Sequence, residues 1–399
     1  MAYYLVLLLL FLLAGSERLT FNYQSIYSYS NRAEKGIFIL AALFLCGGYM
    51  TGSDWRSYEY LYYTADWSGL AEYRKEQLFY VLMIIGKYVI PDFFVFLLIC
   101  KLLVFYSFLR FFKAFSVNIF YSYFFFIPFF ALFLFIDNPL RYMIALSFLI
   151  ESYKYLIGKK FFPFLFLVIA GALFHITILV FIPFYFIRRI LVPLHWLAVL
   201  YLVWMFLFTT RNLLFVVQLT AGIIPFIGHR FVNYIKEAQE MDKLFSVGLI
   251  MNIVLFFWVL SNKQLIERKI QHGKTFFALS IIYLFTVKLG VIFPTGFRFG
   301  YMFGPFFIVV ITLLFQNYRR NLKMAFSWSI GLYIFFLTFK KVDSAYVYLP
   351  YSNYLVHAAT GRLRTFEERF SYNIDYFIER KGHHPHSPQL EVEIIKPNE

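Results

Sequence analysis

The chain has 399 residues, of which 61% are hydrophobic, 23% aromatic and only 15% charged. A soluble domain carries roughly 25% charged residues, so the composition excludes an ordinary soluble enzyme and predicts an all-α polytopic membrane protein. The net charge is +15, but the basic residues lie between apolar runs, which indicates loop topology and argues against nucleic-acid binding. The two cysteines, Cys46 and Cys100, fall inside apolar runs and argue neither for a disulfide framework nor for a metal site.

Apolar runs recur along the chain and predict about eleven membrane segments, some of them short or re-entrant. The first run lacks the positively charged start of a signal peptide and is interpreted as an uncleaved helix. In chain order the predicted segments are Tyr3–Ala14, Gly36–Met50, Leu78–Leu109 (interrupted at Pro91-Asp92), Val117–Ile136, Leu140–Ile157, Phe161–Ile187, Leu191–Thr209, Val247–Leu260, Phe276–Phe293, Phe299–Phe315 and Ala325–Phe339.

Clusters of basic residues between these segments predict the cytoplasmic loops. The segments between them are then external: the loops 51–77 and 211–245, and the shorter stretches 137–140, around 175 and 294–298. The Tyr and Trp residues of the loop 51–77 are typical of an interfacial belt or of a sugar-binding surface. We expect a single membrane domain, 1–342, and a polar C-terminal tail, 343–399. The His-rich run at 383–386 could bind a metal weakly, but we favour a disordered polar end. The basic clusters are Arg18 with Arg32 and Lys35, Arg110 with Lys113, Lys159-Lys160, Arg188-Arg189, Lys263 with Arg268, Lys269 and Lys274, and Arg319 with Arg320 and Lys323.

Segment 161–187 lies between two of these clusters, although two full crossings need about 40 residues. It is either a pair of short helices with His175 at a sunken tip or one long crossing that breaks the positive-inside rule. We favour the pair, because non-helical backbone is tolerated at membrane depth where it lines a cavity.

Two polar residues in this apolar part of the chain are candidates for chemistry. Arg141 follows Pro139 near the predicted external face; it is either an interfacial arginine or a clamp for phosphate or pyrophosphate, which suits a bidentate guanidinium. His175 is either a hydrogen-bonding residue between helices or a general base or phosphate donor.

A second cationic group is predicted around the sequence FPTGFRFGY. Arg298 follows the helix-breaking Pro294 and Gly296 and shares a helix face with Tyr301, three residues later. Lys288 lies on the preceding segment toward the same side. Because two cations converge there, an anion site is more plausible than either residue would suggest alone.

The external loop 51–77 supplies the carboxylates. Asp54 and Arg56 open the loop, and Asp54 either caps a helix or is the best external carboxylate to act as a base. Glu76, at the end of the loop, is the second choice for that role.

Several common enzyme motifs are missing from the sequence. It contains no Walker A loop, zinc-peptidase motif, nucleophile elbow or dinucleotide-binding fingerprint. No nucleotide-sugar domain is visible, so any enzyme here takes a substrate that the membrane carries.

Short motifs follow one another in a recognisable order. They are G-S-D-x-x-x-Y in the loop 51–77 with Glu76 after it, L-R-x-x-I-A-L at Leu140–Leu146, a Lys-Lys turn, A-L-F-H-I-T around His175, F-R-F-G-Y around Arg298, and Leu349-Pro350-Tyr351. In this order they resemble the EpsG-type group of bacterial exopolysaccharide and O-antigen repeat-unit polymerases, which are Wzy-like. The resemblance covers about residues 50 to 355, and its specificity lies in the order because each motif is short.

The resemblance implies a multi-pass protein of the bacterial inner membrane, related in fold to the lipid-linked GT-C glycosyltransferases, with its active site facing the periplasm. Such an enzyme joins oligosaccharide units borne on undecaprenyl pyrophosphate. A hydroxyl of one unit attacks the anomeric carbon of the growing chain, and undecaprenyl pyrophosphate leaves. The implied partners are these lipid-linked glycans and membrane lipid, with a chain-length regulator as a further candidate.

The predicted residues fit that chemistry. Arg141 and Arg298 would stabilise the leaving pyrophosphate, and Asp54 or His175 would accept the proton of the attacking hydroxyl. No metal or other cofactor is expected, because arginines can neutralise the charge. The expected substrate-binding residues are Arg56, Tyr58, Glu76, Lys288, Tyr301 and Tyr351.

Two other functions remain open. An O-antigen ligase or a GT-C monosaccharide transferase would use similar substrates, but Asp54 and Glu59 are a poor match to the acidic pair common in the first external loop of such transferases. A transporter or flippase of lipid-linked sugars would move the substrate without forming a bond. The lack of an internal repeat argues against the transporter.

Overall fold

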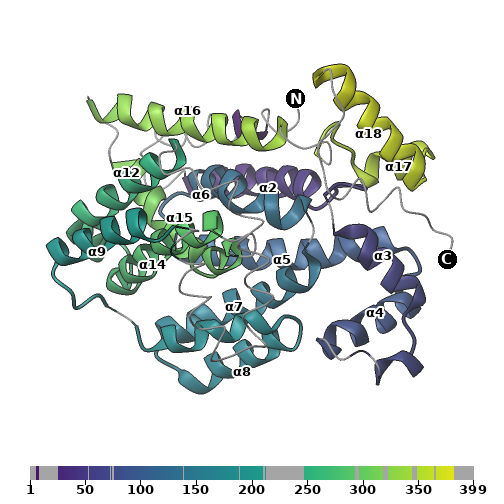
Figure 1. Ribbon diagram of the computed structural model, residues 1–399, viewed down its shortest axis with the longest axis horizontal. Coiled ribbons are helices and arrows are strands. Elements are labelled where there is room, and N and C mark those ends of the chain that lie inside the picture. The colour runs from purple at the N-terminus through teal and green to yellow at the C-terminus, as the bar shows by residue number, and fades with distance from the viewer. Residues whose placement is uncertain are drawn as a thin grey trace. The chain divides into compact units, whose positions relative to one another are not determined.

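The computed structural model describes residues 6–8, 26–52, 54–71, 73, 76–137, 139–187, 189–209, 212, 247–292, 296–317, 322–343, 348–363 and 365–381 (Figure 1). Within these ranges the regular structure is helical, and extended pairing is confined to an isolated antiparallel bridge between Gly48 and Asn353. The predicted all-α class is therefore confirmed for the described part of the chain. The chain divides into two compact units, unit 1 (1–105, 127–144 and 328–399) and unit 2 (106–126 and 145–327).

Unit 1 combines both ends of the chain with the predicted external loop 51–77. Its first long helix begins ahead of the predicted Gly36–Met50 and stops short of Met50, because the polar turn before Gly36 is also helical and Gly47-Gly48 ends the helix. Helices α3 and α4 pack against each other. The elements are α2 (Ile26–Leu45), α3 (Trp55–Thr64), η1 (Ser68–Leu70), α4 (Gln77–Val89), the π-helix η2 (Ile127–Ile136), α17 (Tyr354–Thr360), α18 (Phe366–Lys381) and the parts of α5 (Phe93–Phe115), α7 (Leu140–Ile157) and α16 (Leu322–Asp343) that fall within the unit.

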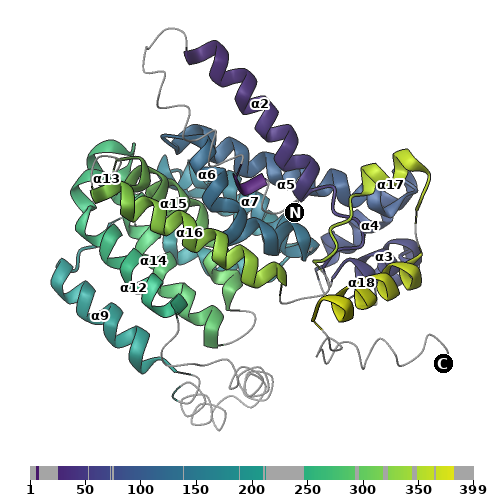
Figure 2. The same ribbon diagram turned by 90° about the horizontal axis from the view of Figure 1, so that it is seen from above.

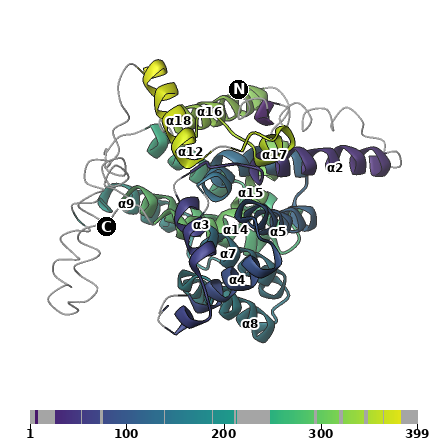
Figure 3. The same ribbon diagram turned by 90° about the vertical axis from the view of Figure 1, so that its right-hand side faces the viewer.

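Part of the predicted polar tail is helical and packs on the end of α2 within unit 1. Tyr351 Oη donates to the carbonyl of Phe44 at 2.6 Å, and the N–H of Tyr354 donates to the carbonyl of Gly47 at 2.7 Å. Figure 3 shows α17 beside α2, as these bonds require. Aromatic residues of this tail pack on apolar side chains of unit 1: Tyr351 contacts Phe44, and Phe366 contacts Trp55. Burial of these rings favours the folded α17 and α18. The His-rich run at 383–386 lies outside the described residues.

Unit 2 is built around the helix pair α14 and α15, the closest packed pair of its elements (Figure 2). α15 is buried continuously from Gly300 to Phe315. Gly290 permits this packing, because a Cβ there would lie 3.2 Å from the Cα of Phe297. The unit also contains α6 (Ile119–Phe126), α8 (Phe161–Ala172), η3 (Ile176–Tyr185), α9 (Leu194–Leu207), α12 (Val247–Ser261), α13 (Lys263–Lys269), α14 (Gly273–Ile292) and α15 (Phe297–Asn317).

The described helices identify a membrane protein. Three are long and apolar enough to cross a bilayer: α5, residues 273–290 of α14, and α15. The pair α12 and α13 adds a fourth span if its 61° bend is counted as one broken crossing. The total of about eleven segments stays a prediction, because several predicted segments are shorter apolar helices. The predicted external segment 211–245 lies, apart from Asn212, outside the described residues.

Two interruptions predicted from the sequence are confirmed. The segment 78–109 breaks between α4 and α5, around Pro91. Segment 161–187 forms two short helices, α8 and η3, which pack against each other and meet at His175. α8 has 12 residues and is therefore about 18 Å long, at 1.5 Å per residue. It cannot cross the roughly 30 Å apolar core of a bilayer alone.

Candidate functional site

Hydrogen bonds and a tight glycine turn in unit 1 fix the position of the residues just before α7. Tyr348 Oη donates to both carboxylate oxygens of Asp137, at 2.7 and 2.8 Å. The backbone N–H of Asp54 donates to the carbonyl of Asp137 at 3.4 Å. Gly52 has φ +80°, and a Cβ there would lie 2.1 Å from the carbonyl oxygen of Ile136. Only glycine fits, so Gly52 and the Asp54–Asp137 hydrogen bond bring the segment before α3 to the start of α7.

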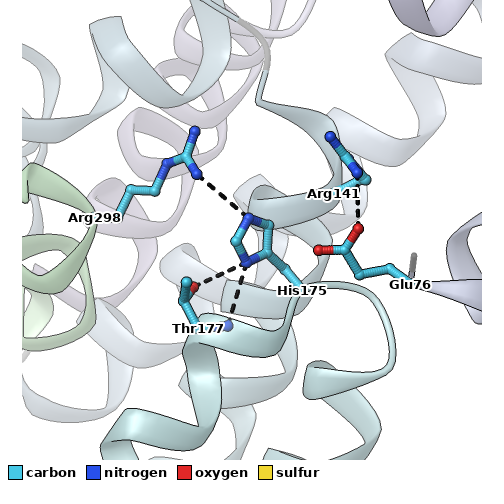
Figure 4. Close-up of polar contacts among 5 residues, drawn as sticks. All are labelled: Glu76, Arg141, His175, Thr177 and Arg298. Atoms are coloured by element: carbon cyan, nitrogen blue, oxygen red, sulfur yellow. Dashed lines mark hydrogen bonds and ion pairs between the residues drawn. The ribbon is translucent and has the colours of Figure 1, made fainter. Parts of the chain in front are cut away.

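Arg141 lies in the first turn of α7 and forms an ion pair with Glu76, which directly precedes α4 (Figure 4). The Nη1 and Oε2 atoms are 2.7 Å apart, and the side chains are 30% and 15% exposed. A charge-assisted hydrogen bond of this length fixes the guanidinium in one orientation. The arginine therefore stays accessible while its direction is set by a carboxylate.

Aromatic rings surround this ion pair. The guanidinium carbon of Arg141 lies 5.9 Å from the ring centroid of Tyr58 and 6.0 Å from that of Phe79. The ring of Tyr73 stacks on Tyr80 at 4.6 Å. Burial raises the pKa of the Tyr58 and Tyr73 hydroxyls, and Arg141 opposes the shift in both. The two phenols therefore remain protonated near neutral pH and can donate hydrogen bonds to a ligand.

Asp54 belongs to the same region of unit 1. It occupies the N-cap position of α3, but its side chain makes no capping hydrogen bond. Its negative charge also raises the pKa of Tyr58, by less than burial does. The capping interpretation is not supported by its geometry, and a half-buried carboxylate near Tyr58 keeps the role of base open.

In unit 2, His175 and Arg298 form a second polar pair (Figure 4). Arg298 lies in the first turn of α15, and its Nη1 is 3.5 Å from Nε2 of His175. The imidazole Nδ1 lies 2.9 Å from Thr177 Oγ1 and 3.4 Å from the Thr177 N–H. His175 is only 8% exposed. The pair thus joins the α8–η3 tip to the start of α15 within one unit.

The contacts of His175 fit two positions of the ring proton. Arginine can only donate, so the Arg298 contact at 3.5 Å makes Nε2 the acceptor and puts the proton on Nδ1, which then donates to Thr177 Oγ1. The Thr177 N–H, at 3.4 Å, instead makes Nδ1 the acceptor. In both arrangements a neutral imidazole keeps one acceptor nitrogen, which a general base requires.

The two groups of residues share a chemistry suited to anions and hydroxyl groups. Each presents an arginine beside a residue that can orient it or take a proton. Across the described ranges no three His, Cys, Asp or Glu side chains are grouped to hold a metal ion.

A sequence model of the EpsG family matches residues 35–354. The chain belongs to the EpsG family. The resemblance predicted from the order of motifs is thus confirmed, and it links this membrane protein to exopolysaccharide polymerisation. Comparison with curated proteins found no match, and neither did comparison with solved structures. The EpsG match includes the Arg141 and the His175 groups and every predicted site residue.

Two predicted substrate-binding residues of this EpsG-family chain have packing partners in unit 1. The guanidinium of Arg56 lies 3.7 Å from the ring centroid of Phe366 in α18, and Figure 2 shows α18 alongside α3. Tyr351 donates to Phe44 and accepts from Asn353 Nδ2 at 3.0 Å. Both residues therefore help to hold the C-terminal segment, and their contact with substrate stays a prediction.

The remaining predicted residues lie in the α14–α15 pair of unit 2. Lys288 is 3% exposed and Tyr301 is 4% exposed. The ring of Tyr301 packs edge-on against Phe297 at 5.4 Å. Their convergence on Arg298 stays a prediction.

Lys101, a residue of α5 within unit 1, is a candidate that was not predicted from the sequence. Its side chain is completely buried, and Nζ has no hydrogen-bond partner among the described residues. A Cβ on Gly48 would lie 4.0 Å from this nitrogen, so the amine faces the turn after α2. Lys101 is a charged residue within a long apolar segment, and charged residues inside membrane segments are candidates for function. This pattern could have identified it from the sequence.

Proposed function

We propose that this EpsG-family protein polymerises oligosaccharide repeat units carried on undecaprenyl pyrophosphate, at the outer face of the bacterial inner membrane. The observation that carries the proposal is the Arg141–Glu76 pair among the tyrosines of unit 1. It combines an oriented guanidinium, which suits pyrophosphate, with aromatic faces and phenol donors, which suit sugars. The proposal includes a fold related to the GT-C glycosyltransferases.

The reaction replaces one bond to the anomeric carbon with another. The acceptor hydroxyl oxygen of one lipid-linked unit forms the new glycosidic bond to the anomeric carbon of the growing chain. The bond from that carbon to the pyrophosphate oxygen breaks, and undecaprenyl pyrophosphate leaves with the electron pair. The hydroxyl proton passes to a basic side chain and then to water.

Arginine side chains stabilise the departing group. Negative charge grows on the pyrophosphate oxygen as the bond breaks, and a pre-oriented guanidinium lowers the energy of that state more than that of the bound substrate. Arg141 is oriented by Glu76, and Arg298 by His175. We assign both to leaving-group stabilisation.

The base is either Asp54 or His175. Asp54 is a half-buried carboxylate near Tyr58 in unit 1. His175 is a buried imidazole in unit 2 whose ring has contacts on both sides. Either can accept a hydroxyl proton, and the proposal requires one of them to do so.

A reconstituted reaction tests the function. Purified protein in nanodiscs receives undecaprenyl-pyrophosphate-linked repeat units as its only substrate, and the products are separated by length. We expect a ladder of glycans, lost in Arg141→Ala and partly retained in Arg141→Lys. The matched control is Arg110→Ala, because Arg110 is likewise an arginine paired with a glutamate, Glu151, at 3.2 Å.

The same experiment separates the alternatives. Transfer of a preformed polymer to a second acceptor, without elongation of repeat units, would indicate a ligase. Movement of lipid-linked units across the bilayer with unchanged glycan length would indicate a transporter. Either result would overturn the polymerase assignment. A partner that regulates chain length would change the distribution of the ladder but not its existence.

A further inference from the structure

Unit 2 contains a cavity of about 770 Å³ whose described lining includes none of the residues assigned to the glycan chemistry. Three separate stretches of chain line it: the turn between α7 and α8, the segment that follows η3, and the turn between α13 and α14. The basic side chains in its wall are Lys159, Arg189 and Lys274, with His272 beside them. Positively charged side chains from three distant parts of the sequence therefore line the same cavity.

The charge of this wall is unbalanced. Glu267 is the acidic residue among the described lining, against the formal positive charges of Lys159, Arg189 and Lys274. The carboxylate of Glu267 also lies 4.0 Å from Nζ of Lys263, which does not line the cavity. An anionic ligand would reduce the repulsion among the remaining cations.

Helix ends add to the positive potential. Lys159 and Lys160 immediately precede α8, and Lys274 lies in the first turn of α14; neither helix has an acidic residue in its first turn. Cations are disfavoured at this positive end of the helix dipole. The arrangement is electrostatically unfavourable for the protein alone and becomes favourable when an anion is bound.

The backbone directs Lys159 to this place. Lys160 N–H donates to the carbonyl of Tyr155 at 2.8 Å and Lys159 N–H to that of Leu156 at 3.2 Å, which is the Schellman arrangement at the end of α7. Lys159 occupies its left-handed position, with φ +59°. Glycine is preferred at a left-handed position. Here the glycine of the turn, Gly158, comes one residue earlier, and Lys159 itself takes the strained conformation.

Apolar side chains at the rim indicate what kind of molecule carries the anion. Phe186 and Leu191 line the cavity and are 70% and 77% exposed. Large exposed apolar residues next to cations are typical of a surface that meets lipid headgroups and the upper acyl chains.

We propose that this cavity is a phosphate-binding site, occupied by the phosphate of an anionic phospholipid or by that of a soluble phosphorylated compound. Guanidinium and ammonium groups are the usual partners of phosphate oxygens. Lys159, Arg189 and Lys274 bind the phosphate, and Phe186 with Leu191 contacts the apolar part of a lipid. The site is independent of the proposed polymerase activity.

Binding to the purified full-length protein tests the site, with native mass spectrometry as the readout. The probes are short-chain phosphatidylglycerol, short-chain phosphatidylcholine and inorganic phosphate, each supplied alone. The test variant changes Lys159, Arg189 and Lys274 to Gln. The control variant changes Lys160, Arg268 and Lys269 to Gln, which removes the same charge near two of the three lining stretches but not from the described lining.

We expect phosphatidylglycerol to bind the unsubstituted protein, with a dissociation constant about tenfold higher in the test variant, a change of about 1.4 kcal/mol. The control should change it less than about twofold, because exposed charges elsewhere contribute little. If inorganic phosphate binds instead and shows the same difference, the site is confirmed with a soluble source.

Equal weakening in both triple variants would show general surface attraction and overturn the proposal. So would binding that neither variant changes, or phosphatidylcholine binding as tightly as phosphatidylglycerol. If a triple variant does not purify as a monodisperse protein, Lys274→Gln against Lys269→Gln makes the same comparison with one charge each.

Discussion

Arg141 in unit 1 and Arg298 in unit 2 have different partners. Arg141 is held by the carboxylate of Glu76 at 2.7 Å, whereas Arg298 donates across 3.5 Å to the imidazole of His175. A carboxylate orients an arginine and balances its charge, while a neutral imidazole orients it weakly and leaves its charge unchanged. In unit 1 the carboxylate of Glu76 therefore fixes the orientation of the Arg141 guanidinium. In unit 2 Arg298 lies beside His175, which can accept a proton.

The residues around the two arginines also differ. The Arg141 group lies among Tyr58, Tyr73 and Phe79, which are large faces for a sugar ring. The His175 group is tied to the hydroxyl of Thr177 at 2.9 Å. We therefore assign sugar positioning to the aromatic residues around Arg141 and proton transfer to His175, while both arginines stabilise the leaving group.

The sharpest test asks which group contains the base. Substitutions His175→Gln and Asp54→Asn keep a polar side chain but remove its proton-accepting ability. We expect one of them to lower the polymerisation rate about 10²–10⁴-fold, and the comparison favours His175. Single-turnover rates on lipid-linked units measure this, with Thr177→Val as a control that loosens the ring without removing it. A large loss in Asp54→Asn together with a small one in His175→Gln would reverse the assignment.

Removing either guanidinium should have the next largest effect. Arg141→Ala and Arg298→Ala each lose charge stabilisation of the leaving group, for which about 10²–10³-fold in rate is typical. Glycan ladders and turnover rates provide the measurement, and membrane insertion is checked in parallel. Normal ladders from either variant would remove that arginine from the mechanism.

The carboxylate partner should matter less than the arginine it holds. Glu76→Gln keeps a hydrogen-bond acceptor but loses the charge, so we expect about a tenfold loss of rate and about 1–3 kcal/mol of stability for a partly buried pair. Thermal unfolding in detergent and turnover measure the two effects. If Glu76→Gln were as inactive as Arg141→Ala, Glu76 would itself contact substrate, as the sequence analysis predicted.

The smallest effect is expected at Lys101, and it has the opposite sign. Lys101→Met keeps the length of the side chain and removes a buried ammonium that has no hydrogen-bond partner among the described residues, so we expect stabilisation of about 1 kcal/mol or more. Lys101→Ala should instead destabilise the protein because it leaves a cavity. Melting temperatures of both variants decide this. A destabilised Lys101→Met would show that the amine has a favourable contact in unit 1.

Local pattern predicted much of the fold. The boundaries of α7 match the predicted segment 140–157, and the breaks near Pro91 and at His175 follow from short-range signals, namely a helix-breaking proline and a run too short to cross the bilayer twice. α2 was placed too late, because a hydropathy window does not register the polar turns with which a helix begins.

The sequence by itself determined the helical membrane class, the family and the residue types of the candidate site, because apolar runs and ordered motifs are properties of the chain. Only the tertiary structure decided the partners. Arg141 meets Glu76 across 65 residues, and Arg298 meets His175 across 123. Arg56 stacks on Phe366, which the sequence analysis had assigned to a polar tail. Helical periodicity relates side chains only a few positions apart, so pairs at these separations are fixed by packing.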